Sequence, residues 1–479
     1  METGKRPQTK EQRQKQAISR LKNENSKLRE ENKKLRQENE HLRSELENVL
    51  LRIDELTSIV FGKKNKDQKK KKYGFDDDDK PRRHREPLSY RRETPSDDDV
   101  TDTEFCEINN CPDCGTRLAR KQLVIRYIED IRIPVLEALG DKGDNVKVKK
   151  IIKQEIEKGY CPNCQRWHSK IPIGSKAVIL GPQAKQLVAY VINILRLTYS
   201  QTKNIIWDLY QIKISDGEIT NILDNVSSAL RPEFERLKTR ILQAKSVHLD
   251  ETGHQTGKDK NYSWILASGQ TEEAVFEIGK SRGKGNAEKL LQDYRGVRVT
   301  DCFGAYKNLV GDHQVCWVHI LRKAKDLSIN ANLDAHKRQF ASLIHDDLKD
   351  IYKEVKIITR TEYNLRTRQL VLPPLKEKLN QVISKIDQFN NPPQKLIDLK
   401  GQLRRYTHQL FTCITHEDVA PENNQAERKL RHLVLKRKNS FGTKTEKGNQ
   451  ILSTNLSVLM SIWWQDRDNF WPKLNQLLA

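Results

Sequence analysis

The chain has 479 residues, and its 87 Lys and Arg residues outnumber its 65 Asp and Glu residues, which gives a formal net charge of +22. No apolar run approaches the ~18 residues that a membrane-spanning helix needs, and the polar N-terminal residues lack the apolar core of a secretion signal. We therefore expect a cytoplasmic protein of about three domains, and its positive charge favours a polyanion as partner. Eight cysteines in a reducing compartment favour metal ligation or buried thiols over disulfides.

Residues 1–61 are predicted to form a dimerising leucine-zipper coiled coil. From Ile18 to Val60 apolar side chains recur every seven residues, with mostly leucine at the d positions. Asn25, Asn32 and Asn39 occupy successive a positions, where two facing amides satisfy each other only in a parallel, in-register dimer. We predict a homodimer that can form a higher oligomer on DNA. The alternatives are a long solvated helix in a monomer and a basic leucine zipper, but the preceding segment is only mildly basic.

Residues 62–105 combine little apolar content with blocks of single-sign charge. Such a composition buries too little surface to offset the entropy of ordering the chain. We therefore predict a disordered charged linker.

Residues 106–176 contain two Cys-x-x-Cys motifs, a spacing that lets two thiolates of one tight turn reach the same Zn²⁺. The segments 123–134 and 146–159 are rich in β-branched residues and flank a turn at 140–144, which is typical of a zinc ribbon. Redox-active cysteines are the alternative. We expect the ribbon to contact DNA, although zinc ribbons also serve as plain scaffolds. The predicted ligands of this structural zinc are Cys111, Cys114, Cys161 and Cys164.

Residues 177–235 are predicted to be helical and to resemble a helix-turn-helix. The segment 200–210 fits one helix, and Ser215 with Glu218 forms a Ser-x-x-Glu capping box for a second helix towards Leu230. The second helix of such a pair can enter a major groove of DNA. A helical hairpin that packs on the next domain explains the same pattern.

Residues 236–450 carry the pattern of an α/β catalytic domain. The segments 246–252, 262–268 and 274–278 predict an antiparallel meander, and a helix at 286–294 leads to a fourth strand at 296–301. A further helix precedes a fifth apolar segment at 313–320. This order matches a ribonuclease-H-like core within a multidomain α/β chain. Asp250 and Asp301 lie where two of its strands end, so we expect two neighbouring carboxylates that need a cation.

A third carboxylate is expected from Glu427, in the first turns of a helix that Asn423 or Asn424 can cap. Three carboxylates can hold two Mg²⁺ or Mn²⁺ ions, which activate water or a 3′-hydroxyl for attack on a phosphodiester. Glu422 and Asp418 are rival third acids, but they precede the helix. Glu251 is not a candidate, since its side chain should point to the face opposite Asp250.

These residues resemble the insertion sequence 66 family of bacterial transposases. The resemblance lies in the segments 248–252 (HLDET), 301–306 (DCFGAY), 316–323 (CWVHILRK), 423–428 (NNQAER) and 437–439 (RKN). It implies an Asp-Asp-Glu catalytic triad of Asp250, Asp301 and Glu427, and a bacterial, nucleoid-associated enzyme. The order of zipper, ribbon, helical segment and catalytic core is also similar to that family.

The helix after Glu427 and its surroundings supply the predicted DNA contacts, because residues 428–447 have eight basic residues against one acidic residue. Cys316 and His319 either shape the active site or have a buried structural role. A helical insertion at about 324–415 either covers the site or is a spacer, and 451–479 should be a C-terminal helical tail. The predicted DNA-binding residues are Arg428, Arg431, Arg437, Lys438, Asn424, Arg322 and Lys323.

Three functions are compatible with this pattern. The first is a DNA transposase that cleaves the ends of a mobile element and joins the freed 3′-hydroxyl to target DNA. The second is a non-enzymatic DNA-binding regulator or an inactive transposase remnant. The third is a nuclease of the same fold that lacks strand transfer.

Overall fold

The structure is a computed structural model that describes residues 92–133, 148–174, 176–361 and 364–478, together with Lys27, Glu30 and Lys34. The chain divides into two units, Met1–Glu86 and Pro87–Ala479. The predicted coiled coil therefore lies outside the described residues except for those three positions, and the predicted turn at 140–144 also lies outside them. Within the described part, no helix is both long enough and apolar enough to cross a bilayer.

The cysteine-containing region is built on a five-stranded sheet. Strands β2 and β3 pair antiparallel from Ala119 opposite Tyr160 to Ile131 opposite Lys149, so the two strands predicted for this region are confirmed. The strand order is β1-β3-β2-β5, and β4 pairs with β3. The elements are the 3-10 helix η1 (Asp97–Asp99), β1 (Asp102–Cys106), β2 (Ala119–Ile131), β3 (Lys149–Cys161), β4 (Arg166–Ser169) and β5 (Val178–Leu180).

The prediction of a disordered linker is wrong for residues 92–105. Strand β1 pairs parallel with β3, and the backbone N–H of Thr101 donates to the carbonyl of Ile151 at 2.8 Å. Arg92 forms ion pairs with Glu129 at 2.5 Å and Glu218 at 2.8 Å. The segment is ordered because its backbone completes a sheet edge and its charges find opposite charges, although its side chains bury little apolar surface. Residues 62–91 lie outside the described part.

A second five-stranded sheet has the order β10-β9-β6-β7-β8. Strands β6, β7 and β8 pair antiparallel, as the predicted meander requires, whereas β9 and β10 run parallel to β6. The predicted fifth segment is split, since β10 ends at Val315 and a helix begins at Trp317. The elements are β6 (Ser246–Thr256), β7 (Asp259–Ser268), β8 (Ala274–Gly279), α5 (Lys284–Leu291), β9 (Val297–Thr300), η2 (Gly304–Tyr306) and β10 (Asp312–Val315).

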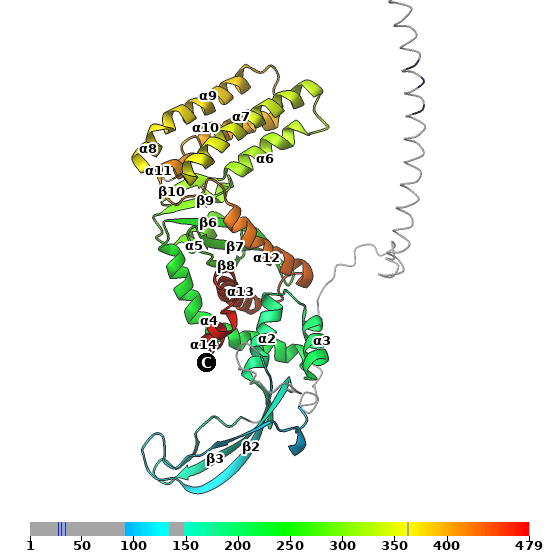
Figure 1. Cartoon of the computed structure of the whole chain (residues 1–479), viewed down its shortest axis with the longest axis vertical. Coiled ribbons are helices and arrows are strands. Elements are labelled where there is room, and N and C mark those ends of the chain that lie inside the picture. The colour runs from blue at the N-terminus through cyan, green and yellow to red at the C-terminus, as the bar shows by residue number, and fades with distance from the viewer. Residues whose placement is uncertain are drawn as a thin grey trace, which may run out of the picture. The chain divides into compact units, whose positions relative to one another are not determined.

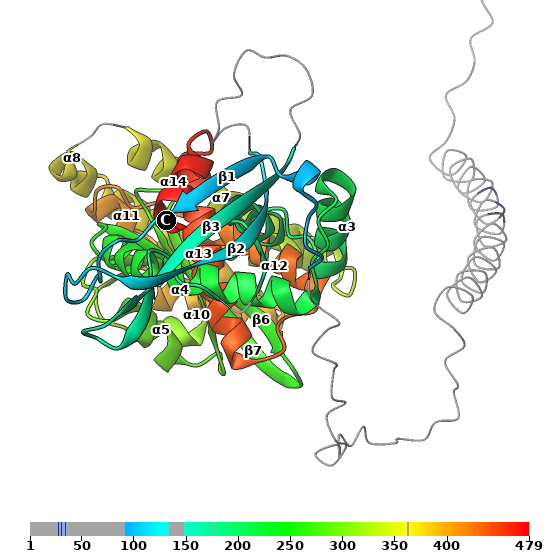
Figure 2. The ribbon, with the colours of Figure 1, turned by 90° about the horizontal axis from the view of Figure 1, so that it is seen from below.

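The segment predicted as helix-turn-helix-like contains α2 (Pro182–Asn193), α3 (Tyr199–Tyr210) and α4 (Asp216–Leu242). The hydroxyl of Ser215 caps α4 by accepting from the Glu218 N–H at 3.1 Å, but the Glu218 carboxylate pairs with Arg92 instead of closing the capping box. Helix α4 continues past Leu230 to Leu242, and its buried face packs against β8 and α13. Figures 1 and 2 show this long helix beside the sheet. The second helix is thus packed on the second sheet, as expected for the alternative of a helical hairpin that packs on the next domain.

The helical insertion has its own apolar core. Its buried leucines and isoleucines also cover Val297 and Val299 of β9 and Val315 of β10. The N–H of Trp317 donates to the carbonyl of Pro421 at 3.0 Å, so the insertion starts and ends at one place. Its helices are α6 (Trp317–Ser328), α7 (Ala335–Arg360), α8 (Leu365–Leu370), α9 (Leu372–Gln388), α10 (Gln394–Arg405) and α11 (Thr412–Thr415).

The C-terminal segment forms α12 (Asn424–Ser440), α13 (Glu446–Gln465) and α14 (Phe470–Leu478). Helix α13 covers the free edge of β8: the Ser461 hydroxyl contacts both the N–H and the carbonyl of Ala274, and the Ser457 hydroxyl accepts from the Phe276 N–H at 2.8 Å. An uncovered edge strand is a template for pairing with other chains. The predicted tail is therefore packed on the second sheet, and its tryptophans lie against the apolar core formed there.

Candidate active site

The three predicted catalytic carboxylates come from two adjacent strands and one helix. His248 of β6 lies opposite Val299 of β9 in the parallel pair, so Asp250 and Asp301, each two residues farther on, lie at the same level of the sheet. Strand β6 continues past Asp250 to Thr256, which differs from the expectation that the strand ends there. Glu427 lies in the first turn of α12, which packs across β6 and β7.

Asp250 is in an environment that opposes its ionisation. Burial raises the pKa of its carboxyl group to about 7, and the negative charges of Glu251, Asp301 and Glu427 add to the shift. The N–H of Glu251 donates to the Asp250 carboxylate at 2.9 Å and partly offsets these effects. The three predicted acids therefore lie within electrostatic range of one another, and their mutual repulsion favours a bound cation.

Glu427 faces two residues of α6. Its Oε1 lies 3.6 Å from Nδ1 of His319, and its Oε2 lies 3.9 Å from the guanidinium of Arg322. Both Glu427 Oε1 and His319 Nδ1 are buried without a hydrogen-bond partner among the described residues. Burial lowers the pKa of His319, which favours its neutral form. A buried carboxylate oxygen without a donor is costly unless it receives a ligand.

The donor atoms fit a hard divalent cation. Asp250, Asp301 and Glu427 supply oxygens only, which suits Mg²⁺ or Mn²⁺. In the described residues these three carboxylates do not converge within 4.8 Å of one another, whereas ligand atoms of Cys316, His319 and Glu427 do. Sets of carboxylates that flank two ions need not touch one another, because each binds a different side of the pair.

Asn423 joins α12 to β6, a role that the sequence did not indicate. It stands at the N-cap position of α12, but its side chain makes no capping bond. Its amide donates to the Leu249 carbonyl at 2.7 Å, and its Oδ1 lies 3.0 Å from Nδ1 of His248. Its own N–H donates to the Cys316 thiol at 3.2 Å. Cys316 is buried, so in the structure it supports the start of α12.

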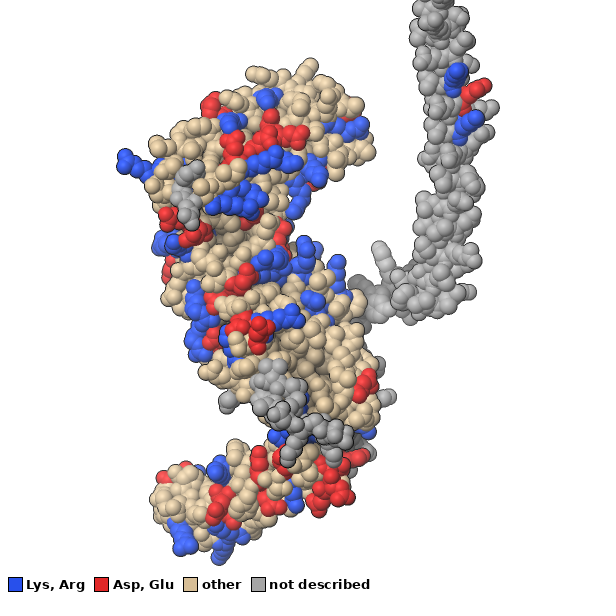
Figure 3. Space-filling view, in the orientation of Figure 1, with Lys and Arg blue, Asp and Glu red and all other residues tan. Residues whose placement is uncertain are grey.

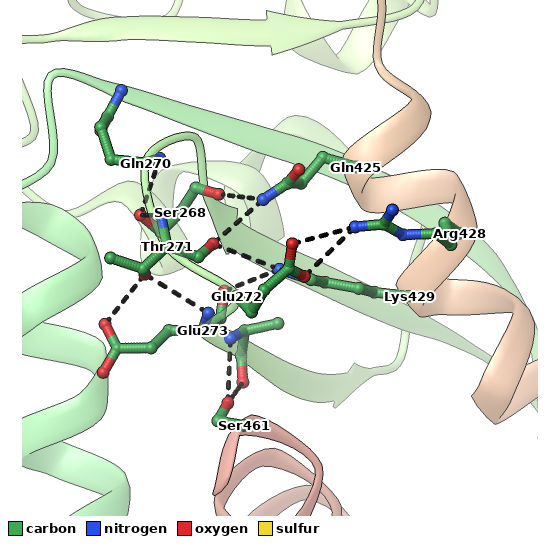
Figure 4. A network of polar contacts seen from close by, with 10 residues as sticks. Ser268, Gln270, Thr271, Glu272, Glu273, Gln425, Arg428, Lys429 and Ser461 are labelled. Atoms are coloured by element: carbon green, nitrogen blue, oxygen red, sulfur yellow. Dashed lines mark hydrogen bonds and ion pairs between the residues drawn. The ribbon is translucent and has the colours of Figure 1, made fainter. Parts of the chain in front are cut away.

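Side chains on the next turn of α12 fix the helix on the loop between β7 and β8 (Figure 4). The Gln425 amide donates to the carbonyls of Ser268 at 2.9 Å and Thr271 at 3.0 Å. Lys429 is 1% exposed and pairs with Glu272 at 3.2 Å. Arg428, predicted to bind DNA, forms an exposed ion pair with the same glutamate at 3.1 Å. Exposed pairs of this kind are weak, so Arg428 is free to exchange Glu272 for a phosphate.

The second half of α12 contacts the C-terminal end of α2. The Lys436 ammonium donates to the carbonyl of Ile192 at 2.6 Å, and Nε2 of His432 lies 2.8 Å from the carbonyl of Asn193. Cations at a helix C-terminus are favoured by the helix dipole. Lys429 and Lys436 thus belong to the interior, although their charges contributed to the basic cluster that the sequence suggested.

The predicted DNA contacts that remain accessible lie on or near α12. Arg437 is half-buried, and its guanidinium donates to the Thr252 hydroxyl at 3.2 Å, close to Asp250 along β6. Lys323 donates to the Gln402 amide oxygen at 2.7 Å. Figure 3 shows Lys and Arg side chains gathered over α12. Five of the predicted residues are exposed, namely Asn424, Arg428, Arg431 and Lys438 on α12 and Arg322 on α6.

Glu251 has a role that the sequence interpretation omitted. Its side chain does point away from Asp250, but it is 1% exposed and pairs with Arg282 at 2.6 Å. The Tyr306 hydroxyl donates to its other oxygen. Arg282 lies 3.8 Å above the Phe303 ring, and the Phe303 N–H donates to Asp301 at 2.8 Å. Glu251 therefore helps to hold the 301–306 loop, and with it Asp301.

The four predicted zinc ligands converge. The sulfur atoms of Cys111, Cys114, Cys161 and Cys164 lie in one group within 4.8 Å of one another. Two of the separations are 3.8 Å and 3.5 Å, and a tetrahedral Zn²⁺ with sulfurs at about 2.3 Å places them about 3.8 Å apart. This four-cysteine group is therefore compatible with structural zinc. His168, with Nε2 3.4 Å from the Cys111 sulfur, belongs to an alternative set with Asp113.

Comparison with known proteins identifies similarity over the same region. A family model described as Transposase IS66 family matches residues 178–451, which is more than half of the chain. A curated relative, the uncharacterized protein y4hP of Sinorhizobium fredii, is 20% identical over 286 residues, which cover 54% of this chain and 52% of the relative. The chain thus spans about half the length of that relative.

Proposed function

Because the chain belongs to the IS66 transposase family, we propose that it is a DNA transposase. It hydrolyses the phosphodiester at the ends of a mobile element and joins the freed 3′-hydroxyl to target DNA. The proposal rests mainly on one observation: Asp250 and Asp301 follow paired residues of two adjacent strands, and the charges of Asp301 and Glu427 both affect Asp250. The buried and unpartnered oxygen of Glu427 supports it.

We also propose that the catalytic sheet is ribonuclease-H-like. Support comes from the strand order β10-β9-β6-β7-β8, in which β7 runs in the opposite direction to the other four strands. In this arrangement the first strand, β6, is central and the fourth, β9, lies beside it. The first and second acids then come from these two strands, and a helix that follows the sheet supplies the third.

Each part of the site has a task in this proposal. Asp250, Asp301 and Glu427 would hold two Mg²⁺ or Mn²⁺ ions, which would supply activation of the attacking oxygen and stabilisation of the leaving one. Arg322 lies 3.9 Å from Glu427 and is placed to neutralise the phosphate that approaches these carboxylates. The accessible basic residues of α12 bind the DNA backbone on either side.

Two further parts of the molecule complete the proposal. The four-cysteine group holds structural zinc, and the ribbon contacts DNA. The predicted coiled coil joins two chains into a homodimer, so that two active sites are available for the two ends of an element. These roles rest on the cysteine geometry and on the heptad pattern respectively.

An assay of strand cleavage and strand transfer, with Mg²⁺ and DNA from the ends of the element, tests the function. Asp301→Asn should abolish both reactions, whereas Asp346→Asn, at an exposed position of the helical insertion, should leave them intact. Wild-type activity in Asp301→Asn would refute the proposed metal site. Cleavage without joining would identify a nuclease, and DNA binding without either reaction would identify a regulator.

A further inference from the structure

Phe441 has an unusual position for an aromatic residue. It follows the last residue of α12, and its side chain is 84% exposed, more than any other large apolar residue in the described part of the chain. A phenyl ring in water gains nothing from burial, so its presence here does not stabilise the fold. An exposed aromatic ring is informative when its surroundings indicate what covers it.

The backbone at this position is strained and well fixed. Phe441 has φ +58°, a left-handed conformation that is rare for bulky residues and that glycine adopts without cost. Its N–H donates to the Arg437 carbonyl at 2.7 Å, and the N–H of Thr443 donates to the Gln255 carbonyl at 2.9 Å. A Cβ on Gly442 would lie 2.1 Å from that same Gln255 oxygen. The turn is therefore pressed against the β6–β7 hairpin and projects the ring from a rigid base.

The neighbours of Phe441 along the chain favour a polyanion over an apolar protein surface. Lys438 in the last turn of α12 and Lys444 in the following loop are both exposed, and Arg431 is exposed farther back on the same helix. Figure 3 shows this side of the molecule rich in Lys and Arg around α12. Cores of protein interfaces are poor in such charges, whereas proteins that bind unpaired bases combine basic side chains with aromatic rings.

The distance from the catalytic carboxylates defines which part of the DNA this ring would meet. Phe441 is 14 residues beyond Glu427, so a rise of about 1.5 Å per residue separates them by about 21 Å. For a DNA strand that runs along α12, this separation corresponds to roughly six nucleotides at about 3.4 Å each. A ring at this distance is clear of the reacting phosphate. It can still act on the same DNA segment.

We propose that Phe441 stacks on an unpaired or unstacked base of the DNA substrate, about six nucleotides from the bond that is cleaved. The inference rests on the proposed transposase function and adds to it a feature of the substrate, a locally opened duplex. Aromatic stacking is tolerant of base identity, because every base has a π-face. The ring therefore discriminates between paired and unpaired bases and not between base sequences.

The test measures binding of the full-length protein to an arbitrary-sequence duplex and to the same duplex with one mismatched base pair. Wild type should prefer the mismatched duplex, because a mismatch lowers the cost of unstacking. Phe441→Gly and Phe441→Ala should lose that preference and bind about 10- to 100-fold more weakly to the mismatched duplex. Phe441→Trp should keep it. Leu370→Ala, which removes a 74% exposed leucine on α8, is the matched control and should behave as wild type.

The variants also separate stacking from folding and from charge. Phe441→Gly relieves the left-handed strain, so it should be at least as resistant to heat as wild type while it loses the mismatch preference. Lys438→Ala should weaken binding to both duplexes alike and lower the salt dependence by about one ion. An equal mismatch preference in wild type and Phe441→Gly would overturn the inference, as would a changed oligomeric state of Phe441→Gly with the preference unchanged. Absence of binding to either duplex by wild type would instead contradict the proposed function.

Discussion

Replacement of Asn423 by alanine tests how helix α12 is held against strand β6. The side chain is 1% exposed and connects α12 to β6 through the Leu249 carbonyl and the His248 ring. Asn423→Ala removes both bonds, so the buried Leu249 carbonyl and the buried His248 ring each lose a partner. Each such group costs about 1–3 kcal/mol, so we expect a loss of about 2–6 kcal/mol in the free energy of unfolding.

The adjacent residue provides a matched control. Asn424 is exposed at the first position of α12, and Asn424→Ala should change stability by less than about 0.5 kcal/mol. Urea unfolding measures both, with stability judged from the midpoint at an unchanged slope. Asn423→Ala should also slow strand cleavage, because Glu427 loses its fixed position relative to Asp250. Equal unfolding midpoints for the two variants would refute the reasoning.

Three further predictions concern other parts of the structure. Cys161→Ser should lower the zinc content of the purified protein and destabilise the ribbon, as measured by metal analysis and by proteolysis. Burial lowers the pKa of Lys436 to about 8, so folding favours its neutral form, and stability should rise as the pH increases from about 8 towards the ordinary value near 10.4. The midpoint of thermal unfolding should rise less with pH in Lys436→Met than in wild type across this range. Glu251→Ala removes the ion pair with the half-exposed Arg282 and takes the acceptor from the buried Tyr306 hydroxyl, and it should cost about 1–3 kcal/mol in urea unfolding.

Each of these predictions has a control within the chain. Cys106 lies outside the four-cysteine group, and Cys106→Ser should retain the zinc. Lys438 is exposed on the same helix as Lys436, and Lys438→Met should keep the wild-type pH dependence. Glu288 pairs with Lys284 at the surface of α5, and Glu288→Ala should cost less than about 1 kcal/mol. If a variant and its control behaved alike, the corresponding interpretation would be wrong.

Local patterns predicted much of the architecture. The paired Cys-x-x-Cys motifs predicted a group of four sulfurs, and short apolar or β-branched segments predicted strands β2 and β3 and the β6–β8 meander. These features depend on residues close in sequence or on repeated spacing, which sequence reasoning reads well. The prediction that Asp250 and Asp301 are neighbours followed from the order of the strands, and the parallel pairing of β6 with β9 agrees with it.

Long-range contacts account for the features that the sequence did not predict. Asn423 had a plausible local role as a helix cap, but its partners on β6 are about 175 residues away. Lys429 and Lys436 had the charge of DNA-binding residues, yet tertiary packing buries both of them. The acidic and basic residues of 92–105 suggested disorder, whereas their partners lie on β2, β3 and α4. Composition does not reveal such pairings, because it carries no information on which distant residues meet.

The hydrogen bond between Trp317 and Pro421 has a consequence for how the chain folds. The entropy lost on closing a flexible loop grows with the logarithm of its length, and each doubling costs only about 0.6 kcal/mol. Once α6 to α11 have assembled around their own core, the chain leaves that core at the point where it entered. The effective loop between β6 and Glu427 is then much shorter than their separation in sequence. We therefore expect the late step of folding to be the docking of α12, at a rate set by assembly of the helical insertion rather than by a search over the full sequence separation.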